Sequence, residues 1–453
     1  GAMLAAGLCG VAQADPQTAA ALRDKALTDP TAWNVLESLT TEIGPRPVGS
    51  PAAMRARDWG IAKLKALGFV NVHAEEFAKS AWHRGEEEAE VIAPFPQKLA
   101  ILGLGHSVAT PPEGLEGQIV VLKSVADLLA APPNAFKGKI VVVNQPMTRT
   151  QTALGYGLGV QARGMPSEAA KRGAIAYLTR SISTSQSRAP HTGTTHYSDP
   201  AFQIPAAALG VPDADLLEHM AARGPVRIRL KLLPTVDDNG KAWNVSGEIP
   251  GSGKSNEVIV IGGHLDSWDP GTGAIDDGAG VAITTAAAKL IGDLKTHPRR
   301  TIRVVMWGSE EQGGSEKAYL DAHQNELANM VIASESDLGA DNAYSLQLPA
   351  GAMENAEMKP LASLLAPLKV LVSPEPAAGA GSDVEGLQAK GVPVFALNQD
   401  ASRYFDYHHS ADDTLSIVDR TQLNQNVAAW AVILDTIADS TVTFRKALDT
   451  KPH

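Results

Sequence analysis

The stretch from Val258 to Asp266 reads Val-Ile-Val-Ile-Gly-Gly-His-Leu-Asp. Its apolar, β-branched start predicts a buried strand that ends at the two glycines. His264 and Asp266 then lie at the carboxyl end of that strand, where open α/β sheets bind their ligands. An imidazole there can bind a metal ion, and an aspartate two residues later can accept the other ring N–H. Taken alone, such a pair is more often a surface ion pair than a metal site.

Four more segments rich in metal-binding residue types follow, each near a predicted strand end or helix start: Asp276-Asp277, Glu310-Glu311, Asp337 and His408-His409. Each has a simpler explanation by itself, such as helix capping by Asp276 or Asp277. Together with His264 they bring imidazole and carboxylate groups to successive strand ends, which is the donor set of hydrolytic two-metal sites. In an adjacent glutamate pair, one side chain can bind metal while the other reaches the attacking water.

Composition excludes several other classes. The 453 residues include 50 Asp plus Glu against 39 Lys plus Arg, a formal charge of −11. This acidic excess argues against nucleic-acid binding, which needs a positive surface. The single cysteine excludes an intramolecular disulfide and a cysteine-rich zinc cluster, so any metal must rest on His, Asp and Glu. No run is long and apolar enough to predict a membrane-spanning helix, and we expect no membrane partner.

The first fourteen residues resemble the end of an export signal. Gly1-Ala2-Met3 is similar to a cloning remnant, and the small apolar residues after it end in Ala12-Gln13-Ala14, a pattern typical of signal cleavage. The alternative is a flexible terminus of small residues. We expect an exported product, periplasmic or secreted, and because Cys9 lies in the leader, the mature chain would lack cysteine.

The remaining chain divides into three predicted parts. From residue 236 to 453, strand and helix patterns alternate and predict a mixed, mostly parallel sheet between two layers of helices. Helical spacing in residues 15–109 predicts an N-terminal part of that same domain. Short β-rich runs in residues 110–235 predict an inserted domain. Its loop His191–Tyr197 is a candidate to cover a cleft.

The motifs resemble the co-catalytic zinc aminopeptidase and glutamate carboxypeptidase family. They occur in that family's order: His264-x-Asp266, Asp276-Asp277-Gly278, Glu310-Glu311, Asp337 and His409-x-x-x-Asp413-Thr414. The stretches 263–269, 311–314 and 408–410 look closest to its plasma glutamate carboxypeptidase (carboxypeptidase Q) branch, and Gly44-Pro45-Arg46-Pro47 is similar to its N-terminal motif. The resemblance implies a zinc exopeptidase fold, of the phosphorylase/hydrolase-like type, with the insert as a protease-associated domain.

The resemblance also implies two zinc ions per chain, one held by His264 and Asp337, one by Glu311 and His409, with Asp276 as the bridging ligand. Family spacing selects Asp276 over Asp277 and His409 over His408. Asp266 would not bind metal itself but would orient the His264 ring.

The implied reaction is hydrolysis of dipeptides or short peptides with free termini, in which Glu310 acts as general base beside a zinc-bridging hydroxide. Arg403 is a candidate clamp for a substrate carboxylate, and Tyr407 or Tyr404 a candidate donor to the oxyanion. Gly381-Ser382-Asp383 resembles a loop near the family's substrate pocket, although Val384 departs from its pattern.

Two other classes remain as alternatives. One is a non-catalytic peptide-binding or receptor homologue that has lost its ligands. The other is a single-zinc, glutaminyl cyclase-like acyltransferase. The branch that the chain resembles is dimeric, so a homodimer is expected on that basis alone.

Overall fold

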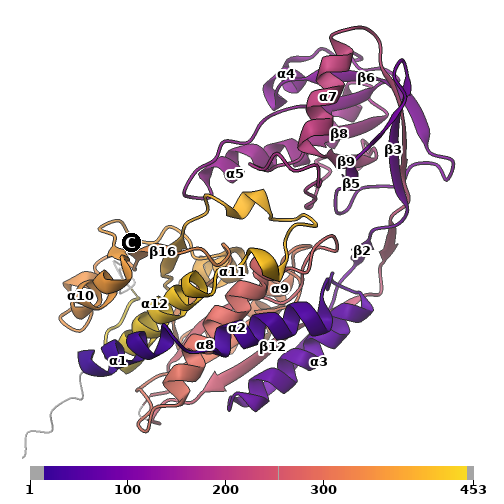
Figure 1. Cartoon of the computed structure of the whole chain (residues 1–453). Helices are drawn as coiled ribbons and strands as arrows, with labels where there is room; N and C mark the ends of the chain where they lie inside the picture. Colours follow the sequence, from indigo (N-terminus) through magenta and orange to yellow (C-terminus); the bar gives the residue numbers. More distant parts are fainter. Residues whose placement is uncertain (1–14, 254, 446–453) are drawn as a thin grey trace, which may run out of the picture.

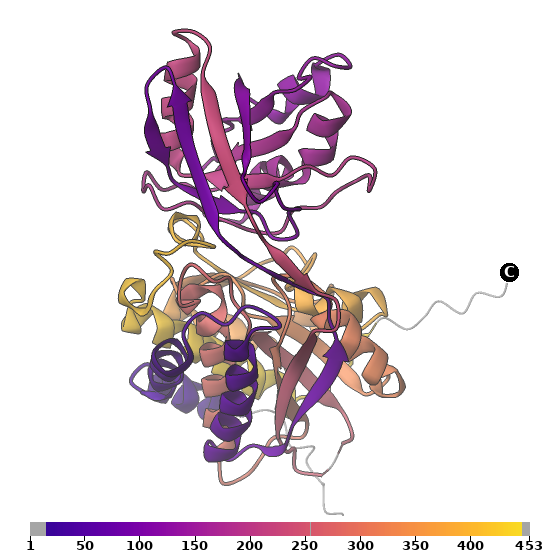
Figure 2. The same cartoon turned by 90° about the vertical axis from the view of Figure 1, so that its right-hand side faces the viewer.

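The computed structural model describes residues 15–253 and 255–445, so the predicted export segment lies outside the described residues. The chain forms two lobes (Figures 1 and 2). Between them runs a ribbon of two antiparallel strands, β2 (Ala81–His83) and β11 (Thr235–Asp237). We call the lobe between these two strands in sequence the upper lobe, and the other the lower lobe.

A five-stranded sheet forms the centre of the lower lobe. Its order is β1 (Val70–Ala78), β12 (Lys241–Ile249), β14 (Thr301–Trp307), β13 (Val258–His264) and β15 (Met330–Glu335). Strand β13 pairs in parallel with β14 and with β15, whereas β12 pairs antiparallel with β1 and with β14. The predicted mixed α/β fold is therefore confirmed, and the mostly parallel arrangement is limited to three neighbouring strands.

Helices cover both faces of this sheet. The helices are α1 (Pro16–Ala26), α2 (Thr31–Ser38), α3 (Pro51–Ala66), α8 (Ala279–Gly292) and α12 (Arg420–Asp439) on one face, and α9 (Ser315–Ala322) and α11 (Ser382–Ala389) on the other. Side chains alternate along β13 accordingly, because successive residues of a strand point to opposite faces. Ile259 and Ile261 pack in the α8 and α12 core, while Val260 packs with Trp307 and Leu387 in the second core.

The upper lobe contains an eight-stranded sheet. In order across the sheet its strands are β4 (Gln97–Leu99), β3 (Glu87–Ala93), β10 (Arg227–Leu232), β6 (Leu115–Leu122), β7 (Ile140–Val143), β8 (Ala176–Arg180), β9 (Ala206–Leu209) and β5 (Ile101–Gly103). Its helices are α4 (Val125–Ala130), α5 (Leu154–Gly159), α6 (Pro166–Lys171) and α7 (Val211–Ala221). Two separate apolar clusters lie on the two faces of this sheet. Three of its strands precede residue 110, where the sequence places the start of the insert.

A smaller sheet of β17 (Leu371–Val372), β16 (Ala343–Gln347) and β18 (Ala396–Gln399) lies beside α10 (Pro360–Leu365) in the lower lobe. Among the described residues, no helix has both the length and the apolar character needed to cross a membrane. Strands β13, β14 and β15 run in the same direction, so their carboxyl ends meet at one edge of the sheet. That edge faces the upper lobe, because Thr194 of the upper lobe donates to the carbonyl of Glu311 beyond β14.

Candidate metal centre

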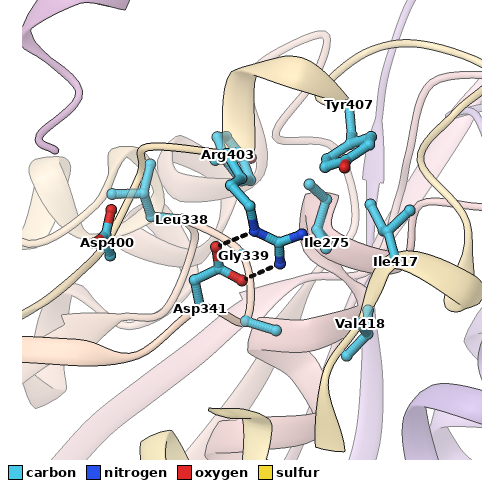
Figure 3. A pocket seen from close by; sticks show the side chains of 11 residues that line it. Ile275, Leu338, Gly339, Asp341, Asp400, Arg403, Tyr407, Ile417 and Val418 are labelled. Carbon is cyan, nitrogen blue, oxygen red and sulfur yellow. Dashed lines mark hydrogen bonds and ion pairs between the residues drawn. The ribbon is translucent and has the colours of Figure 1, made fainter. Parts of the chain in front are cut away.

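Two cavities lie near the carboxyl ends of the parallel strands. Arg403 and Tyr407 line the smaller one, in which Arg403 forms a two-pronged ion pair with Asp341 at 2.6 and 2.9 Å (Figure 3). Neither residue lines the larger cavity, whose wall includes the predicted ligands Asp276, Glu311, Asp337 and His409. The structure therefore does not bring the predicted carboxylate clamp, Arg403, or the predicted oxyanion donor, Tyr407, to those side chains. Tyr404 lines both cavities.

The larger cavity, of about 570 Å³, lies between the two lobes. The lower lobe contributes Asp276, Glu310, Glu311, Asp337, Leu338, Tyr404, Phe405, His408 and His409 to its wall. The upper lobe contributes Ala153, Tyr156, Val160, Arg163, Gly164, Thr194 and His196. Both lobes thus shape the space in which a ligand would bind.

His264 ends β13 and is fully buried. Its Nδ1 atom lies 2.9 Å from the backbone oxygen of Asp266. Its Nε2 atom lies 3.2 Å from Asp276 Oδ1 and 3.5 Å from Asp337 Oδ1. A hydrogen bond from Nδ1–H to the Asp266 carbonyl leaves the Nε2 lone pair directed at the two carboxylates.

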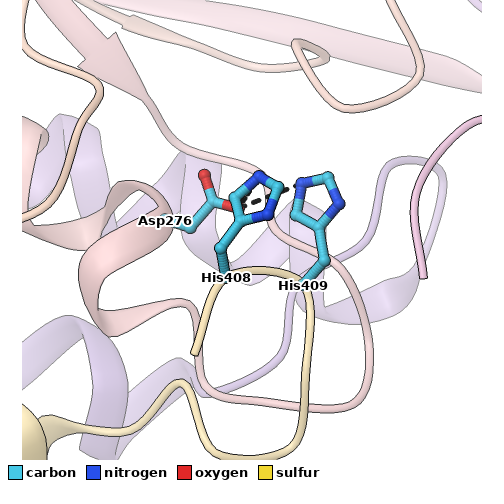
Figure 4. A group of neighbouring side chains, drawn as sticks. All are labelled: Asp276, His408 and His409. Carbon is cyan, nitrogen blue, oxygen red and sulfur yellow. Dashed lines mark ion pairs between the residues drawn. The ribbon is translucent and has the colours of Figure 1, made fainter. Parts of the chain in front are cut away.

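The second carboxylate oxygen of Asp276 faces a different histidine. Asp276 Oδ2 lies 3.1 Å from Nε2 of His409 (Figure 4). The same His409 nitrogen lies 3.0 Å from Glu311 Oε2. Asp276 therefore stands between two groups of side chains, one with His264 and Asp337 and one with His409 and Glu311.

His408 lies beside this cluster with its ring stacked on that of His409, at 3.5 Å between centroids. Its Nε2 atom lies 3.6 Å from Asp276 Oδ2. His408, Asp276 and His409 are therefore also close enough to one another to bind one metal ion. The ring packs against Tyr156, Tyr404 and Phe405. Burial, together with the neighbouring His409, holds the pKa of His408 well below its usual value.

The carboxylates of Asp277 and Asp266 accept hydrogen bonds from backbone N–H groups. Asp277 accepts hydrogen bonds from the N–H groups of His264 and Gly280, at 3.0 and 2.9 Å. The Asp266 carboxylate accepts from the N–H groups of Glu310 and Glu311, at 3.0 and 3.3 Å, and lies 3.6 Å from His264 Nδ1. Asp266 thus meets His264 through its carbonyl oxygen, while its side chain holds the start of the glutamate loop.

The glycine-rich loop before Asp276 is held by two buried charged residues. Asp413 accepts from the N–H groups of Ala274 and Ile275, at 2.9 and 2.8 Å. The buried guanidinium of Arg46 donates to the carbonyls of Leu265, Thr272, Gly273 and Gly44. The N-terminal motif around Arg46 therefore fixes the two loops that flank the cluster.

Glu310 borders the cavity and is fixed by a hydrogen bond from Ser382 Oγ to its Oε1 at 2.6 Å. Burial raises the pKa of Glu310 to about 7. Burial also raises the pKa of Glu311, to about 8. Ser382 belongs to the loop whose resemblance to a pocket loop was noted in the sequence, and it contacts the predicted base directly.

The cluster has the properties expected of a cation site. Asp276 Oδ2, Glu311 Oε1 and Asp337 Oδ1 are buried, and none of them has a hydrogen-bond partner among the described residues. A tetrahedral zinc ion with bonds of 2.0–2.2 Å separates its ligand atoms by roughly 3.3–3.6 Å, close to the distances from Nε2 of each histidine to its carboxylates. Imidazole and carboxylate groups are donors that zinc accepts. The residues present therefore fit a bound metal.

Comparisons with known proteins identify the family of the chain. The profile of peptidase family M28 matches residues 244–434. The chain is 38% identical over 406 residues to carboxypeptidase Q of Bos taurus, an alignment that covers 89% of this chain and 84% of the relative. The chain belongs to peptidase family M28. This result confirms the predicted family. It also confirms the prediction that the chain is an enzyme, because M28 is a family of peptidases.

Solved M28 structures share the fold. A peptidase M28 precursor from Shewanella amazonensis SB2B superposes with a TM-score of 0.92 at 41% identity, covering 96% of this chain and 99% of its own. A zinc aminopeptidase from Bacillus subtilis superposes with a TM-score of 0.64 at 18% identity, covering 89% and 93%. The second likeness concerns the fold alone.

Sequence reasoning missed part of this M28 site. Thr194 and His196 lie in the loop predicted to cover a cleft, and they do line the cavity. Tyr156 and Arg163 also line it, but no motif marks them, because they come from the upper lobe and more than 90 residues separate them from β13. Only the contact between the lobes reveals them.

Proposed function

We propose that this M28 peptidase is an exported exopeptidase that uses two zinc ions to hydrolyse dipeptides or short peptides with free termini. His264 and Asp337 would hold one ion, Glu311 and His409 the other, and Asp276 would bind both. One observation carries the proposal: the two oxygens of Asp276 face the Nε2 atoms of two different histidines, at 3.2 and 3.1 Å. A carboxylate shared between two ions requires this arrangement.

Zinc in such a site lowers the pKa of water and polarises the scissile carbonyl. The chain's own contribution begins with Glu310, which lines the cavity and is held in place by Ser382. A carboxylate with a pKa near 7 can accept a proton from the attacking water and return it to the leaving amine. Nearby bound cations would lower this pKa, which favours the ionised, proton-accepting form.

Tyr404 replaces Tyr407 as the proposed donor to the oxyanion. It lines the cavity that contains Asp276 and Glu310. Burial, with neighbouring carboxylates, raises the pKa of Tyr404 well above its usual value, so its hydroxyl keeps its proton and can donate a hydrogen bond.

The domain organisation and location belong to the same proposal. The segment predicted at 110–235 would be a protease-associated domain inserted into a catalytic domain of 15–109 and 236–453, and the second sheet, which spans residues 87–232, supports a separate unit of this kind. Export would place the enzyme in the periplasm or outside the cell. A homodimer, and the lack of nucleic-acid and membrane partners, stay predictions.

Hydrolysis of matched peptides tests the proposal. A dipeptide with free termini, its N-acetylated form, its C-amidated form and a long polypeptide are incubated with the zinc-loaded enzyme. We expect the free dipeptide to be cleaved and blocking of at least one terminus to slow cleavage at least a hundredfold. Equal cleavage of all four substrates would contradict exopeptidase action.

The variant Glu310→Gln tests the assigned base. It should keep its zinc and lose about 10²- to 10⁴-fold in kcat, because only the proton acceptor is removed. The exposed Glu354→Gln serves as the matched control. Full turnover by Glu310→Gln would show that another group is the base.

A further inference from the structure

A segment of the upper lobe reaches into the cluster of metal-binding side chains. We call residues 192–195 the strap. The N–H group of Thr192 donates to the backbone oxygen of His409 at 3.0 Å, and the Thr192 oxygen lies 3.2 Å from His409 Nδ1. A hydrogen bond from His409 Nδ1–H to that oxygen leaves Nε2 unprotonated on the side of Asp276 and Glu311.

Arg163 fixes the carbonyl that receives this hydrogen bond. Its Nη1 atom donates to the Thr192 oxygen at 2.9 Å, and its Nη2 atom donates to the hydroxyl of Tyr156. The guanidinium is buried, and Nη1 lies 3.2 Å from His409 Nδ1. Arg163 therefore contacts both the Thr192 carbonyl and the His409 ring that this carbonyl meets.

The other half of the strap touches Glu311. Thr194 Oγ1 donates to the backbone oxygen of Glu311 at 2.7 Å. Between Thr192 and Thr194, Gly193 has φ +139°, and a Cβ atom there would overlap Arg163 Nη1 and lie 2.9 Å from His409 Nδ1. The strap therefore contacts both residues of one proposed metal position, the His409 ring and the Glu311 backbone, and a glycine makes this approach possible.

The strap is firmly part of the upper lobe. The N–H group of Gly105 donates to the Gly193 oxygen at 3.0 Å, and that of Thr195 donates to the Gly105 oxygen at 2.9 Å. On the other proposed position, His264 receives its support from Asp266 in the lower lobe. The two positions thus differ in which lobe supports them.

We propose that the upper lobe completes only the metal position of Glu311 and His409, with Arg163 and the strap as its positioning residues. The inference rests on the proposed two-zinc function. Loss of the hydrogen bonds that Arg163 and the strap make would lower the affinity for zinc at that position. The affinity for zinc at the position of His264 and Asp337 would not change. Loss of the hydrogen-bonded partner of a metal-binding histidine typically lowers metal affinity 10- to 100-fold.

Zinc affinity, measured by competition with a chromophoric chelator, tests this without reference to activity. The full-length variants are Arg163→Met and the nearly isosteric Thr194→Val. The control is Thr110→Val, because Thr110 also donates to a backbone carbonyl in the upper lobe, that of Leu232. We expect both test variants to bind one zinc as the parent does and the second at least tenfold more weakly, with Thr110→Val unchanged.

Two backgrounds assign the weakened position. In His264→Asn, only the position of Glu311 and His409 remains intact. Adding Arg163→Met to this variant should lower the affinity for zinc at least tenfold. In His409→Asn, the same addition should change zinc affinity less than twofold. The inference is wrong if Thr194→Val and Arg163→Met both bind two zinc ions as tightly as the parent. It is also wrong if Arg163→Met fails to fold and Thr194→Val binds zinc as the parent does. In either case the two-zinc function stands. A parent chain that binds fewer than two zinc ions overturns both.

Discussion

At the scale of single residues, Asp276 shows how the cluster depends on charge. Burial alone would raise the pKa of its carboxyl, but the histidines around it outweigh this effect and hold the pKa well below its usual value. Burial has the opposite result at Glu311 and Glu310, whose pKa values rise to about 8 and about 7. So many carboxyl groups in one buried place need cations or protons, and bound zinc would supply the cations.

Ser382→Ala tests how Glu310 is held. Removal of the Ser382 hydroxyl takes away a hydrogen bond to the carboxylate, which should raise the pKa of Glu310 and lower kcat about tenfold. In the pH profile of kcat, the acidic limb should move to higher pH, with KM and zinc content unchanged. The control is Ser363→Ala, an exposed serine on α10 that donates to the Pro360 carbonyl. A pH profile identical to that of the parent would contradict the role of Ser382.

The two adjacent histidines should respond differently to substitution. His409→Asn should lose one of two zinc ions, because its Nε2 atom faces both Asp276 and Glu311. His408→Asn should keep both, because its ring packs among aromatic side chains and burial disfavours its charge. Elemental analysis of the two variants decides the matter. Loss of zinc from His408→Asn alone would reverse the assignment.

At the scale of elements, the sequence predicts best where one strand and its own end carry the signal. Strand β13 begins at Val258, where the sequence predicts a buried strand, and the parallel β13, β14 and β15 bring His264, Glu311 and Asp337 to one edge. Side-chain partners from distant elements could not be predicted. Arg403 pairs with Asp341, which lies 62 residues away in sequence, instead of lining the larger cavity.

Arg46 links the N-terminal motif to the site loops and gives a prediction for this scale. Arg46→Met would remove the donor to the carbonyls of Leu265 and Thr272, and one of the two donors to the carbonyl of Gly273, which Gly278 N–H also reaches. Each buried, unsatisfied carbonyl costs about 1–3 kcal/mol, so the two carbonyls left without a donor should lower the free energy of unfolding by about 2 kcal/mol or more. Denaturant unfolding measures it, with Arg55→Met on exposed α3 surface as control. Equal stability of the two variants would contradict the anchoring role.

At the scale of the whole molecule, polar contacts tie the connecting ribbon and the upper lobe to the lower lobe. Gln312 exchanges hydrogen bonds with the backbone of Trp82 in the connecting ribbon, and Arg84 pairs with Asp269 at 2.7 Å. Such an arrangement carries no sequence motif, which is why the shared cavity could not be foreseen. The start of the second sheet at Glu87 was missed for a similar reason, because β3, which precedes residue 110, pairs with β10 near residue 230.

Removal of metal should destabilise the molecule, and more so at higher pH. Without zinc, the folded chain holds protons on Glu311 up to a pKa of about 8, whereas the unfolded chain releases them near 4.5. Stability of the metal-free form therefore falls as pH rises through that window. We expect the Tm difference between zinc-loaded and chelator-treated protein to be about 5 °C or more at pH 6 and larger at pH 8. A difference that shrinks with pH would contradict this account.

The central claim is that Asp276 joins two zinc positions, and the zinc content of the purified, zinc-loaded chain tests it most directly. Elemental analysis against protein concentration should give about two zinc ions per chain. Asp276→Asn should bind fewer, because both positions lose strength when the shared carboxylate loses its charge. One zinc or none in the parent chain, or two zinc ions bound as tightly in Asp276→Asn, would contradict the claim.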